Sequence, residues 1–149
     1  ECQVIPGVVD IIERFTQMKM PMAIATGGTR ECHEWKMSKH PELKNPFLGV
    51  VTGDDVNEAK PDPEIFLKAK NIFGNVPSEN VLVIEDAPNG VLAATAAGMP
   101  SVLMNTTGYG SKVQLLAEMN VNPTRKFEGF ADFDFSVFTW EPLPIPKEP

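Results

Sequence analysis

The sequence predicts an α/β domain in which helices cover both faces of a parallel sheet. Short apolar runs alternate along the chain with longer segments that have helical spacing, which is the pattern of repeated strand–helix units. The runs are apolar without alternation, as expected for strands buried on both faces. The length of 149 residues, with 42% hydrophobic and 22% charged residues, fits one globular domain.

The first three elements follow from apolar spacing and from prolines. "MAIAT" at 22–26 is a short apolar run between Pro21 and a glycine pair, which favours a buried strand. A polar helix is expected from Arg30 to about Ser38, before His40 and Pro41. A helix over residues 8–18 is expected before them, from an apolar stripe of Val8, Ile11, Ile12, Phe15 and Met18.

The next helix has the clearest boundary signals. Residues 49–55 read as a strand that ends in a polar turn, and the helix follows. Asp62 is expected as its N-cap, Pro63 as its first residue, and Gly74 as the residue after its end. Its predicted core side chains are Ile65, Phe66, Ala69, Ile72 and Phe73.

The second half of the chain continues the alternation and then changes composition. From Asn122 onward aromatic residues and prolines dominate, so we divide the chain into a core at 1–121 and an aromatic and proline-rich extension at 122–149. The core elements expected here are a strand at 81–85, a helix at 90–98, a strand at 101–104 and a helix at 111–119.

Charge and hydropathy exclude two classes of partner. The formal net charge is −7, from 20 acidic and 13 basic residues, and no basic stripe is present that could bind nucleic acid. No segment approaches the roughly 20 apolar residues of a membrane span. The opening "ECQVIPGVVD" lacks a signal-peptide pattern, and we therefore expect a cytoplasmic protein.

Candidate functional residues lie where the predicted strands end. In an open parallel sheet, ligands bind at the carboxyl ends of the strands. "TGGTR" follows the strand at 22–26 and offers the hydroxyl of Thr26 and the backbone N–H groups of Gly27 and Gly28 to an oxyanion. The alternative is an ordinary strand-to-helix turn, with Thr26 or Thr29 as the N-cap.

Lys60 and the pair Glu85–Asp86 are the other candidates. Lys60 precedes Pro61, so its backbone is held extended, and its ammonium could reach over the sheet edge as a point charge for a bound phosphate. It could equally be a solvated surface lysine. Two adjacent carboxylates at a strand end repel each other unless a cation such as Mg²⁺ offsets their charge. The alternative is that Asp86 caps the turn "DAPNG" and Glu85 is solvated.

Taken together, these motifs resemble those of the haloacid-dehalogenase-like (HAD) hydrolase superfamily. "IATGGTR", "KPDPEIF" and "VLVIEDAPNGVLAATAAGM" are similar to its second, third and fourth motifs, and the resemblance covers residues 4 to about 118. Within the superfamily, the sequence of residues 40–73 is similar to that of the pseudouridine-5'-phosphatase group, near the β-phosphoglucomutase branch. The resemblance implies that Thr26 and Gly27 bind the transferring phosphate, that Lys60 neutralises it, and that Asp86 ligates Mg²⁺ with support from Glu85. Asn89 stands where many relatives have another acidic residue.

The resemblance also implies which parts of the family pattern this sequence lacks. The family's nucleophilic aspartate lies in a "DxDxT"-like motif on its first strand, and a helical cap follows that strand. Neither precedes Pro6, so we expect an incomplete Rossmann-like sheet that lacks the strand between 22–26 and 81–85. Its partner would be the missing N-terminal segment of the same protein. Asp132 and Asp134 have the nucleophile spacing, but their flanks argue against a circularly permuted enzyme.

The function implied is a Mg²⁺-dependent phosphatase of small phosphate monoesters. Pseudouridine 5'-phosphate is one candidate substrate, and the reaction would pass through an aspartyl-phosphate. Thr26 and Lys60 would take part in catalysis, and the chain alone is expected to be inactive because it lacks the nucleophile. The alternatives are a phosphomutase of the same superfamily and a non-catalytic binding module. A dinucleotide-binding domain is disfavoured, because no G-x-G-x-x-G turn follows the first strand.

Overall fold

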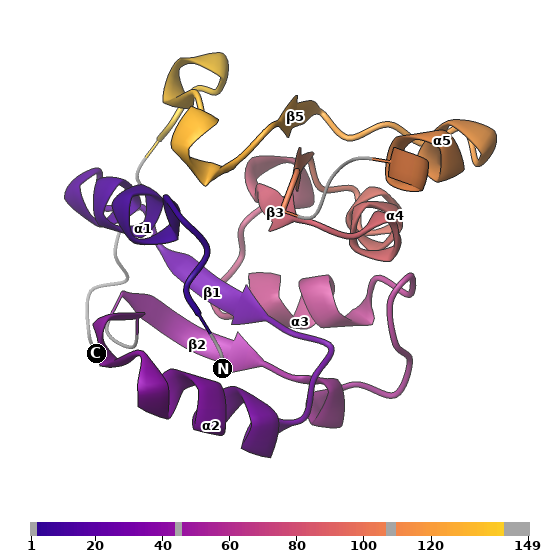
Figure 1. Ribbon diagram of the computed structural model, residues 1–149. Helices are drawn as coiled ribbons and strands as arrows, with labels where there is room; N and C mark the ends of the chain where they lie inside the picture. Colours follow the sequence, from indigo (N-terminus) through magenta and orange to yellow (C-terminus); the bar gives the residue numbers. More distant parts are fainter. Residues whose placement is uncertain (1–2, 44–45, 107–109, 142–149) are drawn as a thin grey trace.

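The strands form two parallel sheets rather than one. A computed structural model describes residues 3–43, 46–106 and 110–141. In it, β1 (Met22–Ala25) pairs with β2 (Phe47–Val51). β3 (Val83–Glu85) pairs with β4 (Ser101–Met104), which also pairs with β5 (Arg125–Phe127). β1 and β3 belong to different sheets, and Figure 1 shows them apart. The expectation that these two strands are not neighbours in one ladder therefore agrees with the structure.

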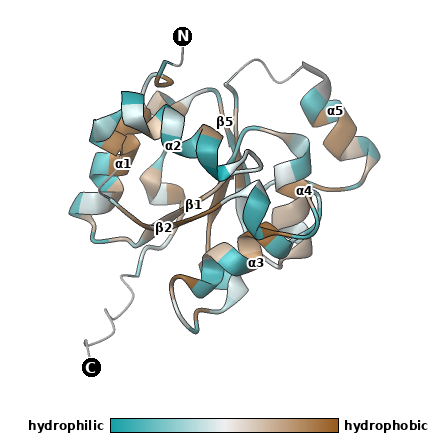
Figure 2. Cartoon of the chain, turned by 90° about the horizontal axis from the view of Figure 1, so that it is seen from below, coloured by the Kyte–Doolittle hydropathy of each residue, from teal (hydrophilic) through white to brown (hydrophobic). Residues whose placement is uncertain are grey.

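Helices cover both faces of the strands, as the sequence predicts. Figure 2 shows α1 and α2 on one side of β1 and β2, and α3 on the other. The alternation of helices and parallel strands confirms the α/β, Rossmann-like class. The helices are α1 (Val8–Gln17), α2 (Arg30–Lys39), α3 (Glu64–Asn71), α4 (Pro88–Ala96) and α5 (Gly110–Glu118).

One core lies between the strands and the helices α3 and α4. Ile65 and Phe66 of α3 meet small side chains of α4, including Ala93 and Ala94, which are fully buried. The alanines let α4 approach the strands closely, and the larger α3 side chains fill the remaining space. This cluster joins strands of both sheets, because Val51 of β2 and Val83 of β3 are members of it.

A second core, on the opposite face, is aromatic. Phe15 of α1 lies 5.9 Å from Phe133 and 5.0 Å from Trp140, measured between ring centroids, both in edge-to-face geometry. The indole of Trp140 donates a hydrogen bond of 2.7 Å to the carbonyl of Phe135. The segment from 125 to 140 is thus packed against α1 and the sheet, although the division at 121 stays a prediction.

The structure differs from the sequence prediction at several boundaries. β2 begins at Phe47, two residues before the segment predicted at 49–55, and the polar turn predicted at the end of that segment is the 3-10 turn η2 (Gly53–Asp55). α3 begins at Glu64 with Pro63 as its N-cap, each one residue later than predicted, and Asp62 accepts a hydrogen bond of 2.9 Å from the Glu64 N–H. β5 was not predicted, because three residues with two exposed side chains carry no apolar run. Residues 142–149 of the predicted extension lie outside the described residues.

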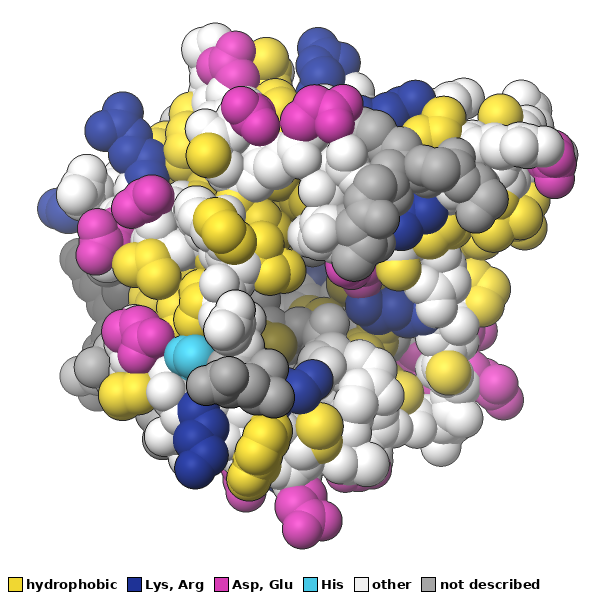
Figure 3. All heavy atoms as spheres, in the orientation of Figure 1, with side chains coloured by type: hydrophobic (Ala, Val, Ile, Leu, Met, Phe, Trp, Pro, Cys, Tyr) yellow, Lys and Arg dark blue, Asp and Glu magenta, His cyan; other side chains and the backbone are white. Residues whose placement is uncertain are grey.

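Among the described segments, no helix combines the length and the apolar character needed to cross a bilayer. On the face shown in Figure 3, basic and acidic side chains are interspersed, and the basic ones form no continuous area.

Candidate active site

The candidate site lies where β1, β2 and β3 end. The sequence places Thr26 directly after β1, Thr52 directly after β2, and Glu85 at the last position of β3. Because parallel strands point the same way, the carboxyl ends within each sheet share one edge. Lys60 belongs to the loop between η2 and α3 and reaches from that loop toward the ends of β1 and β3.

The glycine loop after β1, residues 26–29, is held at both ends. The N–H of Thr26 donates to the carbonyl of Val51 at 2.9 Å, which extends the β1–β2 pairing by one residue. At the other end the hydroxyl of Thr29 accepts from the N–H of Cys32 at 3.2 Å, so Thr29 is the N-cap of α2. The hydroxyl of Thr26 accepts a hydrogen bond of 3.3 Å from the N–H of Gly28, so it faces the glycine loop and does not cap α2.

Lys60 links the two sheets. Its ammonium pairs with Glu85 Oε1 and lies 3.5 Å from the carbonyl oxygen of Ala25. It also lies 4.8 Å from the centroid of the Phe66 ring, a cation–π distance. The two charged side chains are only 13% and 10% exposed, so the pair is largely shielded from water. The alternative of a solvated surface lysine does not describe Lys60.

Glu85 is oriented by the turn that follows it. Its second oxygen, Oε2, lies 3.2 Å from the N–H of Asp86 and 3.4 Å from that of Ala87. A Cβ at Gly90 would stand 2.1 Å from the carboxyl carbon of Glu85, so any other residue at this position would displace the carboxylate from where it lies. Lys60 and the two backbone N–H groups thus offset the charge of the Glu85 carboxylate. The Asp86 carboxylate points toward Thr106 instead, so the repulsion between the two adjacent acids is reduced.

Asp86 remains exposed at the rim. Its Oδ2 accepts a hydrogen bond of 2.9 Å from the Thr106 hydroxyl, and Lys112 donates to its backbone carbonyl at 2.8 Å. A single carboxylate beside a phosphate group is a donor set that fits Mg²⁺, whereas both oxygens of Glu85 already have partners. Within the described residues, no cluster of three or more histidine, cysteine or acidic side chains forms a metal site by itself. Asn89 is exposed at the start of α4.

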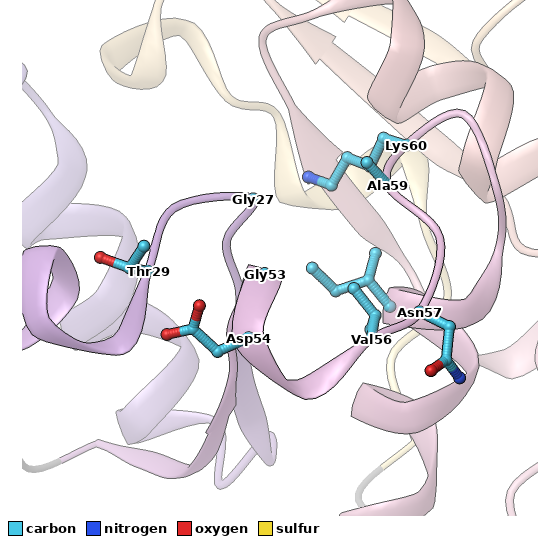
Figure 4. Close-up of a pocket in the computed structure, with 9 residues that line it drawn as sticks. Gly27, Thr29, Gly53, Asp54, Val56, Asn57, Ala59 and Lys60 are labelled. Carbon is cyan, nitrogen blue, oxygen red and sulfur yellow. The ribbon is translucent and has the colours of Figure 1, made fainter.

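A small cavity opens beside the glycine loop. It holds about 260 Å³ and lies between the glycine loop and the segment that precedes α3. Figure 4 shows the Lys60 amine pointing toward Gly27, with Val56 forming part of the opposite wall. Its polar lining includes Thr29, Asp54 and Asn57, and its apolar lining Val56, Ala59 and Ile65.

A second set of contacts, which was not predicted from the sequence, joins η2 to the start of α2. Asp55 accepts hydrogen bonds from the N–H and the hydroxyl of Thr52 at 2.7 and 2.8 Å, and pairs with the Arg30 guanidinium at 2.5 Å. These donors, the Thr52 N–H first among them, lower the pKa of the Asp55 carboxyl below its usual value. Two signals for these contacts were present in the sequence. The acids Asp54 and Asp55 end the segment predicted at 49–55, and Arg30 follows the strand predicted at 22–26.

Asp132 and Asp134 lie in turns of the C-terminal segment. Asp134 accepts hydrogen bonds from the N–H and the hydroxyl of Ser136 at 2.9 and 2.7 Å, which lower its pKa. Asp132 belongs to the turn Phe130–Asp132, which contacts α1. These contacts fit a C-terminal loop held by aromatic residues.

Fold and rim together define a Rossmann-like α/β domain with a lysine, a glycine loop and paired acids at its strand ends. Residues 1–98 match the family model described as "Hydrolase: haloacid dehalogenase-like hydrolase". The chain belongs to the haloacid dehalogenase-like hydrolase family.

Known proteins support the same assignment. The chain is 42% identical over 106 residues to "(DL)-glycerol-3-phosphatase 2" of Arabidopsis thaliana, covering 68% of this chain and 44% of that protein. It is 34% identical over 135 residues to "Probable pseudouridine-5'-phosphatase" of Drosophila melanogaster, covering 88% and 56%. A crystal structure of CbbY from Rhodobacter sphaeroides in complex with phosphate superposes with a TM-score of 0.70 at 26% identity, covering 86% of this chain and 55% of the other. The chain therefore spans about half the length of the relatives it matches.

Proposed function

We propose that the protein is a Mg²⁺-dependent phosphatase of small phosphate monoesters. The observation that carries this proposal is the position of the Lys60 ammonium, which lies beside the end of β1 and pairs with Glu85 at the end of β3. A fixed, shielded cation next to a glycine loop is suited to a phosphate dianion, because its charge acts at low effective dielectric. Both the curated relatives described above carry phosphatase names.

Each rim residue has a role in this proposal. The hydroxyl of Thr26 and the N–H of Gly27 bind the phosphate oxygens, and Lys60 neutralises the charge that develops during transfer. Glu85 fixes the direction of Lys60, and Asp86 would hold Mg²⁺. The ion, when bound, would offset the negative charge of Asp86 and of the phosphate.

We further infer that the nucleophile comes from a strand that lies between β1 and β3. In the described chain, each of these strands pairs on one side only, β1 with β2 and β3 with β4. Unpaired strand edges are binding sites for another strand. That strand would belong to the N-terminal segment of the same protein, and its aspartate would attack the phosphorus to give an aspartyl-phosphate. The chain of 149 residues would then be inactive by itself.

The cavity beside Gly27 suits the alcohol part of a small ester. Its volume of about 260 Å³ lies near the lower end of the range for ligand pockets, which favours a compact substrate. Apolar side chains on one wall and Asp54 on the rim would accommodate carbon atoms and a hydroxyl group, respectively. Glycerol 3-phosphate and pseudouridine 5'-phosphate, suggested by the relatives' names, are the two substrates to compare first.

Two other functions use the same residues. A phosphomutase would transfer the phosphate between positions of a sugar instead of to water, and a non-catalytic module would bind phosphate without turnover. These alternatives are separated by product analysis.

A cytoplasmic location also remains a prediction of the sequence, to be checked by fractionation of cells.

The test is phosphate release by the protein encoded by the complete reading frame. It is assayed with both esters, with Mg²⁺ and with a chelator, and compared with Lys60→Met and with the control Lys39→Met, whose lysine is exposed at the last residue of α2. We expect Mg²⁺-dependent release that falls about 100-fold or more in Lys60→Met and little in Lys39→Met. Release that is independent of Mg²⁺, or unaffected by Lys60→Met, would contradict the proposal.

A further inference from the structure

The turn η2 (Gly53–Asp55) touches the glycine loop through its backbone. The N–H of Gly53 donates to the carbonyl of Gly28 at 2.9 Å. A Cβ at position 53 would stand only 2.5 Å from the carbonyl oxygen of Gly27, so the two backbones are closer than any other residue type would allow. The loop is thus in van der Waals contact with η2 on the side of β2.

Side chains add two further contacts at the same place. The carboxylate of Asp54 accepts a hydrogen bond of 2.8 Å from the Arg30 N–H, the first residue of α2. The guanidinium of that same arginine pairs with Asp55 at 2.5 Å. Arg30 is therefore held at its backbone by one acid and at its side chain by the next.

Asp55 is itself fixed to a buried anchor. Its Oδ2 takes the N–H and the hydroxyl of Thr52, whose side chain is fully buried at the end of β2. Lys68 of α3 donates to its backbone carbonyl at 2.6 Å. A rigid chain of contacts thus runs from the interior at Thr52, through Asp55, to the start of α2 at Arg30.

We propose that η2 sets the geometry of the phosphate-binding loop, with Asp55 and Arg30 as positioning residues that act through Gly27 and Gly28. This inference rests on the proposed function, because it assigns these residues to the binding of its phosphate. An exposed loop with two adjacent glycines has many conformations in the free chain, and fixing them beforehand removes that entropic cost from binding. Neither residue touches the phosphate in this account.

The test uses an isotope-labelled sample of the protein from the complete reading frame, with inorganic phosphate as the probe. Amide resonances of Gly27 and Gly28 are followed during titration of the wild type, Asp55→Asn, Arg30→Gln and the double variant. Asp134→Asn is the matched control, because Asp134, like Asp55, accepts hydrogen bonds from the N–H and the hydroxyl of one nearby residue, but lies in the C-terminal segment.

We expect phosphate affinity to fall about 5- to 10-fold in each single variant, as is typical for loss of one charge-assisted contact. The double variant should be no more than about twofold weaker than either single variant, since both remove the same link. Asp134→Asn should bind like the wild type even if its thermal midpoint is lower. A structural role alone would make affinity follow stability in all variants, the control included.

Two results would overturn the inference. One is wild-type phosphate affinity in both Asp55→Asn and Arg30→Gln, and the other is an additive loss in the double variant. If Asp55→Asn does not fold, Arg30→Gln still tests the link, because it keeps the contacts of Asp55 with Thr52. If the wild type does not bind phosphate at Gly27, the proposed function fails instead, and the positioning is then judged from whether Arg30→Gln shifts the phosphate-free resonances of Gly27 and Gly28.

Discussion

The pair formed by Lys60 and Glu85 gives the sharpest prediction about stability. The two side chains are 13% and 10% exposed, so removing one partner leaves a charge that water reaches poorly. Breaking a buried pair costs about 3–5 kcal/mol, and the remaining exposure places Glu85→Gln near the lower end, at about 3 kcal/mol. Glutamine keeps the size of the side chain and an oxygen for the N–H groups of Asp86 and Ala87, so the change isolates the charge.

Urea unfolding of the wild type, Glu85→Gln, Lys60→Met and the double variant, followed by circular dichroism, measures these costs. Because the double variant leaves no unpaired charge, we expect it to be more stable than the sum of the two single losses predicts, by at least about 1 kcal/mol. Lys68→Met, which breaks the exposed pair with Glu64, serves as the control and should have a smaller effect than Lys60→Met. If the loss in the double variant equals the sum of the two single losses to within about 0.5 kcal/mol, the view that this pair couples the ends of β1 and β3 is refuted.

Three further predictions concern packing, a helix end and pH. Leu103→Ala removes a fully buried side chain of β4 and should lower the free energy of unfolding by about 2–5 kcal/mol in urea. Lys19→Gly should raise the thermal midpoint, since Lys19 follows the C-cap of α1 with a φ of 56° and glycine adopts that conformation without the cost of about 1 kcal/mol. A side-chain hydrogen bond from Lys68, followed by the N–H of Glu58, lowers the pKa of Glu64 from 4.5 to about 2. Its contribution to stability is therefore complete above pH 4.5 and declines as the pH falls toward 2, so the stability difference between the wild type and Glu64→Gln should shrink over that window in acid-titrated melts. A constant difference would contradict this assignment.

The fold was largely predictable because its signals are local. An apolar run predicts a strand at β1 and at β4, and helical spacing of apolar residues predicts a helix at α1. Helix boundaries are marked by Asp62 before α3 and by Gly98, with a φ of 70°, after α4. Parallel order follows from the alternation of strands and helices. β5 could not be predicted in this way, because its pairing with β4 depends on tertiary contacts and not on its own apolar pattern.

The candidate site was predictable in its residue types but not in its connections. Residue order along the chain gave Thr26, Lys60 and the Glu85–Asp86 pair as rim residues. It did not give the ion pair of Lys60 with Glu85, which joins positions 25 residues apart in sequence. The contact of Arg30 with Asp55 has the same character, because it depends on the register of β1 against β2. Such links require knowledge of which loop tips face each other.

We propose that the loop tips bearing Thr26, Lys60 and Asp86 form one site for a phosphate dianion and its Mg²⁺. A crystal structure of the protein from the complete reading frame, grown with Mg²⁺ and a non-hydrolysable phosphate mimic such as tungstate, tests this site most directly. We expect the oxyanion within hydrogen-bond distance of Gly27 N–H and Lys60 Nζ, and a cation on the Asp86 carboxylate. An oxyanion bound elsewhere, with Lys60 still paired only to Glu85, would contradict it.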